Sequence, residues 1–132
     1  MDTGGDTPTP VLVELRGISI YTHHGVTDAE QEVGQRLEID VALELRDCEA
    51  VATDELAGTV DYSEAADLVV AAATETSYRT LERLASVVGE RLVDRFDIAV
   101  ARVRAAKPEP PMALTIGSAG VEVVTRAPAA GA

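Results

Sequence analysis

Residues 35–45 have the sequence QRLEIDVALEL, and this stretch decides the fold. Every second residue from Leu37 to Leu45 is a branched aliphatic one, and the residues between them are mostly charged. Side chains on a β-strand point alternately to opposite faces. The pattern therefore predicts a long strand with one face in a core and the other in water, which is typical of an antiparallel sheet.

Residues 11–21, which precede this stretch, form a second predicted strand. They are rich in β-branched residues, and their apolar residues occur at alternate positions. Gly17 within the run predicts a bulge or a bend. The polar residues 22–33 between the two strands are expected to form a loop.

Two helices are predicted in the middle of the chain, after a connection over residues 47–60 that has room for a helical turn. Asp61-Tyr62-Ser63-Glu64 has the pattern of a capping box, in which Asp61 accepts a hydrogen bond and Glu64 reaches back from the third position. The second helix begins near Thr80 and ends near residues 94–96. The apolar residues of both helices recur at intervals of three and four: Ala65, Leu68, Val69 and Ala72 in the first, and Leu81, Leu84, Ala85, Val88 and Leu92 in the second.

Two further strands are predicted over residues 98–106 and 121–125, with a proline-rich loop after Lys107. The complete order is β-β-α-α-β-β. Paired strands on either side of two consecutive helices predict an α+β fold, an antiparallel sheet with both helices on one face. Such a sheet has two open edges, which invite pairing with other subunits, so we expect an oligomer.

Length and composition set bounds on the class of protein. The chain has 132 residues, enough for one domain, which we place at residues 11–126. Aromatic residues make up only 3%, so the core must be aliphatic. The net charge of -12 makes nucleic acid and anionic membranes poor partners.

The ends of the chain and its single cysteine add expectations about its location. Residues 1–10 lack the pattern of a signal peptide and are expected to form a flexible leader, and residues 127–132 a frayed tail. Cys48 is the only cysteine, so no intrachain disulfide can form. No apolar run approaches the length of a membrane span. We therefore expect a cytoplasmic protein.

Lys107 is the only lysine, and the other ten basic residues of the Lys and Arg count are arginine. An ammonium group is compact, and its surroundings can bring its proton exchange close to neutral pH, which a guanidinium group does not allow. Lys107 is therefore a candidate for chemistry, and the alternative is an ordinary surface cation. Glu30, Tyr62 and Glu82 are the other candidate residues.

Five short motifs occur in order along the chain: His23-His24-Gly25, Gly34-Gln35, Asp61-Tyr62, Leu81-Glu82, and Lys107 with prolines behind it. With these motifs, residues 11–125 closely resemble the dihydroneopterin aldolase family of folate biosynthesis. That family has the tunnelling fold, in which β-β-α-α-β-β subunits form a ring-shaped barrel with active sites between adjacent subunits. The resemblance implies a homo-oligomer, either a tetrameric ring or an octamer of two stacked rings.

The resemblance also implies a reaction and a role for each candidate residue. The reaction is cleavage of 7,8-dihydroneopterin into 6-hydroxymethyl-7,8-dihydropterin and glycolaldehyde. It needs neither a Schiff base, a metal nor another cofactor, because the C=N bond of the pterin ring accepts the electrons. Glu82, beside Leu81, matches the residue that anchors the pterin, and Lys107 matches the residue that transfers protons. Tyr62 matches a tyrosine that enters from the neighbouring subunit, and Glu30 matches an acidic residue that supports the lysine and a water.

Without the resemblance, simpler interpretations would apply to each residue. Glu82 lies off the apolar stripe of its helix and would be a solvated residue, Tyr62 would pack across the first helical turn, and Glu30 would be an ordinary loop residue. The pair His23-His24 could suggest a metal, but no third ligand is spaced to join them. We interpret His24 as a loop residue or one that supports the site without binding the substrate.

Two other functions stay open at this point. The first is a 2′-epimerase of dihydroneopterin or of its triphosphate, since cleavage and re-addition from the other face would use the same residues. The net charge argues against a triphosphate, although Arg79 and Arg83 could be local exceptions. The second is a non-catalytic pterin- or purine-binding ring subunit, against which the four polar candidates argue.

Two features depart from the family pattern: residues 112–119 lack its aromatic or aspartate residues, and Tyr78-Arg79 is bulkier and more basic than expected.

Overall fold

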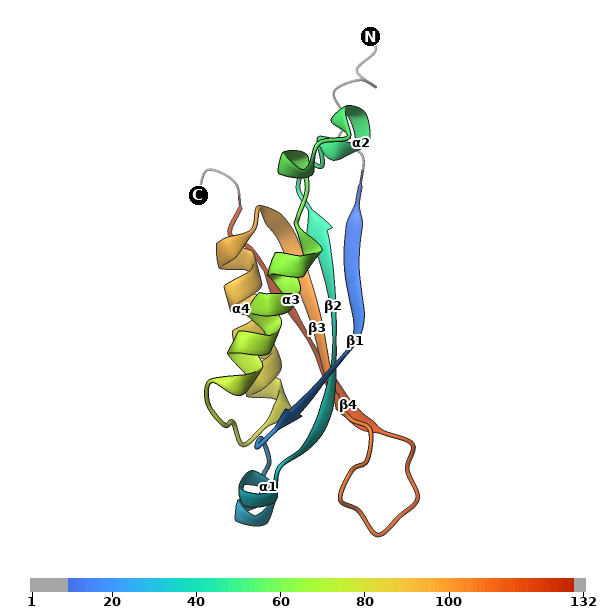
Figure 1. The fold of residues 1–132 in the computed structure, drawn as a ribbon, viewed down its shortest axis with the longest axis vertical. Coiled ribbons are helices and arrows are strands. Elements are labelled where there is room, and N and C mark those ends of the chain that lie inside the picture. The colour runs from blue at the N-terminus through green and yellow to red at the C-terminus, as the bar shows by residue number, and fades with distance from the viewer. Residues whose placement is uncertain (1–9, 130–132) are drawn as a thin grey trace.

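The computed structural model describes residues 10–129, which form a four-stranded antiparallel sheet with two long helices on one face (Figure 1). The strands lie side by side in chain order: β1 (Leu12–Thr22), β2 (Gln35–Leu45), β3 (Ile98–Lys107) and β4 (Ala119–Arg126). The long helices are α3 (Tyr62–Thr74) and α4 (Leu81–Arg95). The predicted α+β class and the predicted order of the four strands and two long helices are confirmed. Residues 1–9 of the predicted leader and 130–132 of the predicted tail lie outside the described residues.

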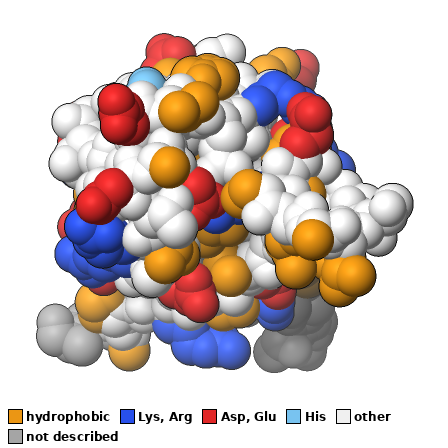
Figure 2. Space-filling model, turned by 90° about the horizontal axis from the view of Figure 1, so that it is seen from below, with side chains coloured by type: hydrophobic (Ala, Val, Ile, Leu, Met, Phe, Trp, Pro, Cys, Tyr) orange, Lys and Arg blue, Asp and Glu red, His pale blue; other side chains and the backbone are white. Residues whose placement is uncertain are grey.

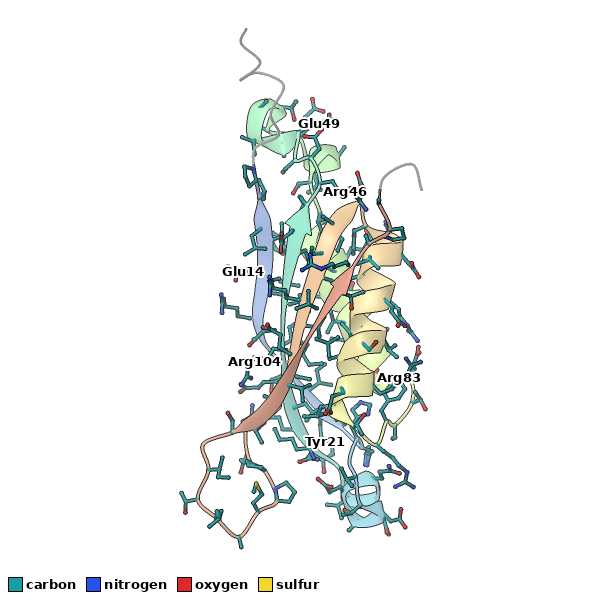
Figure 3. The ribbon with its side chains drawn as sticks, turned by 180° about the vertical axis from the view of Figure 1, so that it is seen from behind. Glu14, Tyr21, Arg46, Glu49, Arg83 and Arg104 are labelled. Carbon is teal, nitrogen blue, oxygen red and sulfur yellow. The ribbon has the colours of Figure 1, made fainter. Side chains whose placement is uncertain are left out.

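The alternating pattern of β2 has the predicted effect. Leu37, Ile39 and Leu43 are fully buried under the helices, and the residues between them face outward. The outward face of the sheet is charged. Nε of Arg102 lies 3.7 Å from Oε2 of Glu44, and Nη1 of Arg102 lies 3.8 Å from Oε2 of Glu122. Figure 3 shows Glu14 and Arg104 on this face, which no helix covers. Exposed ion pairs of this kind contribute about 0–1 kcal/mol each, so stability comes from the aliphatic face.

The bend predicted at Gly17 is present in β1. The pairing of β1 with β2 shifts register between Leu15 and Ile18. Gly17 has a φ of 72°, in the left-handed region that favours glycine. Its N–H donates to Asp40 Oδ1 at 2.6 Å, so a side chain of β2 takes the place of the interrupted backbone ladder.

The two long helices close the core from one side. Four residues of the predicted stripe of α4 are buried, namely Leu84, Ala85, Val88 and Leu92, whereas Leu81 is half-buried. The helix packs on β3 and β4. Helix α3 packs on α4 and β1. Full burial of an aliphatic side chain contributes about 1.5–3 kcal/mol, so this stripe makes a large contribution to holding α4 on the sheet.

The segment over residues 22–33, predicted as a loop, contains a short helix, and that prediction was wrong. Helix α1 (Asp28–Val33) begins with a complete capping box between Thr27 and Glu30. The Glu30 N–H donates to Thr27 Oγ1 at 3.1 Å, and Thr27 N–H donates to Glu30 Oε1 at 3.2 Å. The Thr-x-x-Glu spacing was visible in the sequence, but no apolar stripe follows it to indicate a helix.

The capping box predicted at Asp61 is only half formed. Asp61 Oδ1 accepts the N–H of Ser63 at 2.9 Å and caps α3 as expected. Glu64 does not reach back, because its carboxylate pairs with Arg95 at the end of α4. An ion pair between the two helices has therefore replaced the second half of the local motif.

The remaining connections fix the ends of the strands. The predicted helical turn in residues 47–60 is confirmed by α2 (Ala50–Thr53) and the short 3-10 helix η2 (Leu56–Gly58). Strand β3 continues through Lys107, one residue further than predicted, and β4 begins two residues earlier, at Ala119. The loop of residues 108–118 between them extends beyond the end of the sheet (Figure 1). None of the helices in residues 10–129 is long and apolar enough to cross a membrane.

Candidate active site

A pocket of about 330 Å³ lies where the end of β3 and the start of β4 meet the start of α4. This end of the molecule is seen from below in Figure 2, where hydrophobic side chains lie among charged ones. The walls come from four segments: Gly25 and Val26 of the loop after β1, residues 79–82 at the start of α4, Lys107, and residues 119–121 of β4. The volume is at the lower end of the range for small-molecule sites.

Lys107 reaches this pocket because it is the last residue of β3, where it pairs with Ala119 of β4. Its side chain is only 13% exposed. The ammonium group donates to Glu30 Oε2 at 2.9 Å, a charge-assisted hydrogen bond between residues far apart in the chain. The structure therefore places Lys107 in the pocket wall and brings Glu30 into contact with Lys107. Two of the four candidate residues thus lie together.

Glu30 is held by more than the lysine. Its Oε1 accepts the N–H of Val26 at 3.1 Å as well as that of Thr27, and its Oε2 accepts the side-chain amide of Gln35 at 3.3 Å. The hydrogen bond from Lys107 is the main cause that lowers the pKa of Glu30 to about 2; burial opposes it, and the bonds from Thr27 and Gln35 add to it. Glu30 is therefore a fixed anion at neutral pH.

Glu82 and Leu81 form the opposite wall, in the first turn of α4. Thr80 caps this helix through its side chain, which accepts the N–H of Arg83 at 3.2 Å. Glu82 is exposed, and within residues 10–129 its carboxylate makes no hydrogen bond or ion pair. A carboxylate that is free of protein partners in a pocket wall can accept two N–H groups of a flat ligand.

Tyr62 is the one candidate residue that the structure does not bring to this pocket. It is the first residue of α3 and is 64% exposed. The pocket lies near the other end of α3, and twelve residues at about 1.5 Å each separate the two helix ends by about 18 Å. Figure 1 shows the start of α3 and the start of α4 at opposite ends of the helix layer.

Three residues around the pocket have contacts that the sequence analysis did not predict. Gln35 binds Glu30, and Arg79 donates to the carbonyl of Val26 at 3.0 Å while lying 3.6 Å from Asp28. Gly25 leaves no room for a side chain, since a Cβ there would lie 2.3 Å from the Cβ of Glu30. The sequence had marked the motifs around these residues but carried no signal for their contacts.

The paired histidines His23 and His24 point to different surroundings. His23 is exposed, with Nδ1 2.9 Å from the carbonyl of Gln31, whereas His24 is 1% exposed. Within residues 10–129, no group of three or more His, Cys, Asp or Glu side chains is arranged to hold a metal ion.

Comparison with known proteins connects this geometry to one family. The model of the dihydroneopterin aldolase family matches residues 13–124. Dihydroneopterin aldolases of Methylorubrum extorquens and Streptomyces coelicolor are each 31% identical to this chain, over 81% and 85% of it and over 83% and 94% of their own lengths. The crystal structure of Escherichia coli dihydroneopterin aldolase in complex with neopterin is similar with a TM-score of 0.78 and 27% identity, covering 87% of this chain and 98% of that one.

Proposed function

Because this chain belongs to the dihydroneopterin aldolase family, we propose that the pocket beside Lys107 is one half of an active site for that family's reaction. The protein is a carbon–carbon lyase of folate biosynthesis, which cleaves 7,8-dihydroneopterin into 6-hydroxymethyl-7,8-dihydropterin and glycolaldehyde. The observation that carries the site assignment is that one pocket holds both Glu82, whose carboxylate has no partner among residues 10–129, and the chain's single lysine.

The reaction needs an oriented substrate and two proton transfers. The proton of the 2′-hydroxyl leaves, its oxygen becomes the carbonyl of glycolaldehyde, and the bond between C1′ and C2′ breaks. The electrons of that bond pass into the C=N bond of the pterin ring, and the resulting enamine takes a proton at C1′. The ring is the electron sink, so the residues of this chain have to hold it and move protons.

Glu82 holds the pterin ring in this proposal. Its carboxylate accepts two parallel N–H bonds, from the 2-amino group and from ring N3, which fix both the position and the plane of the ring. Leu81 lines the same pocket and gives the ring an apolar contact. Glu82 also lies in the first turn of α4, where the helix dipole favours a negative charge.

Lys107 transfers the protons, and Glu30 positions it. An acid or base is most effective when its pKa is near the working pH. A pKa of about 2 makes the Glu30 carboxylate too weak a base for this role at neutral pH. Its fixed charge instead holds the ammonium group of Lys107 in one place at the pocket wall.

Tyr62 of an adjacent copy completes the site and helps to return the proton to the intermediate. Two features support this: Tyr62 is exposed about one helix length from its own chain's pocket, and among residues 10–129 no further strand pairs with the outer edges of β1 and β4. We propose a tetrameric ring or an octamer of two rings.

Reassembly of a mixture of the inactive variants Tyr62→Phe and Lys107→Ala should restore partial activity, because some sites then combine two intact halves. Mixtures that stay inactive would exclude a shared site.

Incubation with 7,8-dihydroneopterin and a glycolaldehyde assay tests the whole proposal. Lys107→Ala should abolish release of glycolaldehyde and leave neopterin binding within about threefold, since Glu82 remains. Glu82→Ala should weaken neopterin binding by about 10- to 100-fold, because a hydrogen bond to a charged group contributes about 1.5–3 kcal/mol. Glu90→Ala, on the same helix but outside the pocket, is the control. Unchanged turnover in Lys107→Ala would exclude its role.

The position of Arg79 in the pocket wall favours a second activity, 2′-epimerisation of dihydroneopterin or its triphosphate. Arg79 is one of the residues that line the pocket, and its guanidinium group, which contacts Val26 and Asp28, could meet a phosphate. Product analysis with both substrates separates the two reactions: an epimer of the triphosphate without glycolaldehyde would replace the aldolase assignment. A cytoplasmic location stays a prediction from the sequence.

A further inference from the structure

His24 is a buried histidine that takes no part in the chemistry proposed above. Its ring connects two segments that lie far from it in the chain. Nε2 is 2.7 Å from the carbonyl oxygen of Ala73, near the end of α3, and Nδ1 is 2.8 Å from the backbone nitrogen of Tyr78, in the connection between α3 and α4. The ring also stacks on the ring of Tyr78, with centroids 5.5 Å apart and planes 12° from parallel.

These contacts fix the protonation state of the ring. The N–H of Tyr78 can only donate, so Nδ1 of His24 is the acceptor and carries no proton. The single ring proton is on Nε2, from which it is donated to the carbonyl of Ala73, one of the carbonyls that a helix leaves unpaired at its end. Burial lowers the pKa of His24 below its usual 6.5, so the ring is neutral at neutral pH.

The segment that His24 holds joins the two halves of the pocket. The carbonyl of Tyr78 accepts the N–H of Gly25 at 3.0 Å, so the backbone of Tyr78 is bonded on both sides to the loop after β1. In one direction α4 and Glu82 follow within four residues. In the other direction the loop continues to Val26, whose N–H binds the Glu30 carboxylate that holds Lys107.

We propose that His24 is a positioning residue for the aldol cleavage: its neutral ring holds the start of α4, and with it Glu82, in register with the Lys107–Glu30 pair. The proposal rests on the roles given to Glu82 and Lys107 above. The pterin is anchored at one wall and reacts at the other, so the distance between the walls sets the alignment of the substrate with the lysine. A misplacement of about 1 Å can lower a rate by about 10²-fold without abolishing binding.

Two substitutions separate the two hydrogen bonds of the ring. His24→Asn places an amide oxygen near the position of Nδ1 and so keeps an acceptor for the N–H of Tyr78, whereas it loses the contact with Ala73. His24→Gln places an amide nitrogen near the position of Nε2 and so keeps the donor to Ala73, whereas it leaves the N–H of Tyr78 without its acceptor. His23→Asn and His23→Gln, at the exposed neighbouring histidine, are matched controls.

We expect His24→Asn to keep kcat within about threefold of the wild type and His24→Gln to lower kcat by about 10- to 100-fold. Neopterin affinity should change by less than about threefold in both variants, because Glu82 is intact. Each kcat is calculated per molecule of protein that binds neopterin. The His23 variants should match the wild type. Equal losses in the two His24 variants, or loss of the native fold in both, would show a structural role alone and overturn the proposal. Full activity in His24→Gln would overturn it as well.

A second measurement does not depend on turnover. Hydrogen exchange of the Tyr78 amide should be slow in the wild type and in His24→Asn and faster by about tenfold or more in His24→Gln, because an amide without an acceptor exchanges through smaller openings. Unchanged protection of the Tyr78 amide in His24→Gln would refute the positioning role. A wild-type protein that releases no glycolaldehyde would refute the proposed function, while the exchange result would still decide whether His24 ties the two walls together.

Discussion

Replacement of Glu30 by glutamine is the sharpest test of the electrostatics of this site. The substitution keeps the shape of the side chain and its acceptor oxygen for the capping bonds, and it removes the negative charge that Lys107 contacts at 2.9 Å. Lowering the pKa of Glu30 from 4.5 to about 2 corresponds to about 3.4 kcal/mol, at about 1.36 kcal/mol for each pH unit. Solvent reaches the edge of the pair, so screening should leave about 1–2 kcal/mol of this.

The pH dependence gives the sign of the effect. The pKa of Glu30 is lower in the folded than in the unfolded chain, so its contribution is complete above pH 4.5 and is lost as the pH falls from 4.5 towards 2. Glu30→Gln should therefore be less stable than the wild type by about 1–2 kcal/mol at pH 7. The two proteins should become more nearly equal as the pH falls from about 4.5 to 3.

Denaturant unfolding at matched protomer concentration, at pH 7 and in steps between pH 5 and pH 3, measures this difference. Glu32→Gln, an exposed residue on the same helix, is the matched control for the loss of one negative charge from the acidic chain. A difference between Glu30→Gln and the wild type that stays constant over this pH range would refute the reasoning. So would a Glu30→Gln variant as stable as the wild type at pH 7.

Three further predictions concern the frame around the site. Gly25→Ala should lower turnover and thermal stability together, because its Cβ would lie 2.3 Å from the Cβ of Glu30; a normal melting temperature with normal turnover would contradict this. Thr27→Ala should lower the free energy of unfolding by about 1 kcal/mol through loss of the α1 cap, whereas Thr27→Ser should restore it. Leu84→Ala should cost about 2–5 kcal/mol in denaturant unfolding, since the side chain is fully buried between α4 and the sheet; a loss below about 1 kcal/mol would mean that the core is packed differently.

The sequence predicted most of the sheet because each strand carries its own pattern. The alternation of residues 35–45 depends only on neighbouring residues, and the same holds for the stripe of α4. Helix α1 was missed for the corresponding reason. It has no buried residue, so its sequence has no apolar period, and the capping box is the one local signal of its start.

The candidate site residues were predicted through the family resemblance, which also implied that Glu30 supports Lys107, but the geometry that brings them together was not predicted. Glu30 and Lys107 are 77 positions apart in the chain. Their contact depends on the register of β3 with β4, on the direction in which α1 leaves the loop, and on Gln35 at the start of β2. No local pattern contains this information. The missing half of the capping box at Asp61 shows the same limit, because its glutamate found a partner on another helix.

Strand β4 contributes to two surfaces at once. Its residues 119–121 line the pocket, and the same strand is a free edge of the sheet. A pterin in the pocket and a second copy paired at this edge would both contact one short segment. Thermodynamic linkage then requires the two effects to be equal. If assembly changes the affinity for pterin by some factor, pterin binding changes the affinity between the copies by the same factor. If the copies assemble as proposed and the two contacts influence each other, neopterin should shift the concentration at which the protein dissociates on dilution. The enzyme's own substrate would then act as an effector of its quaternary structure.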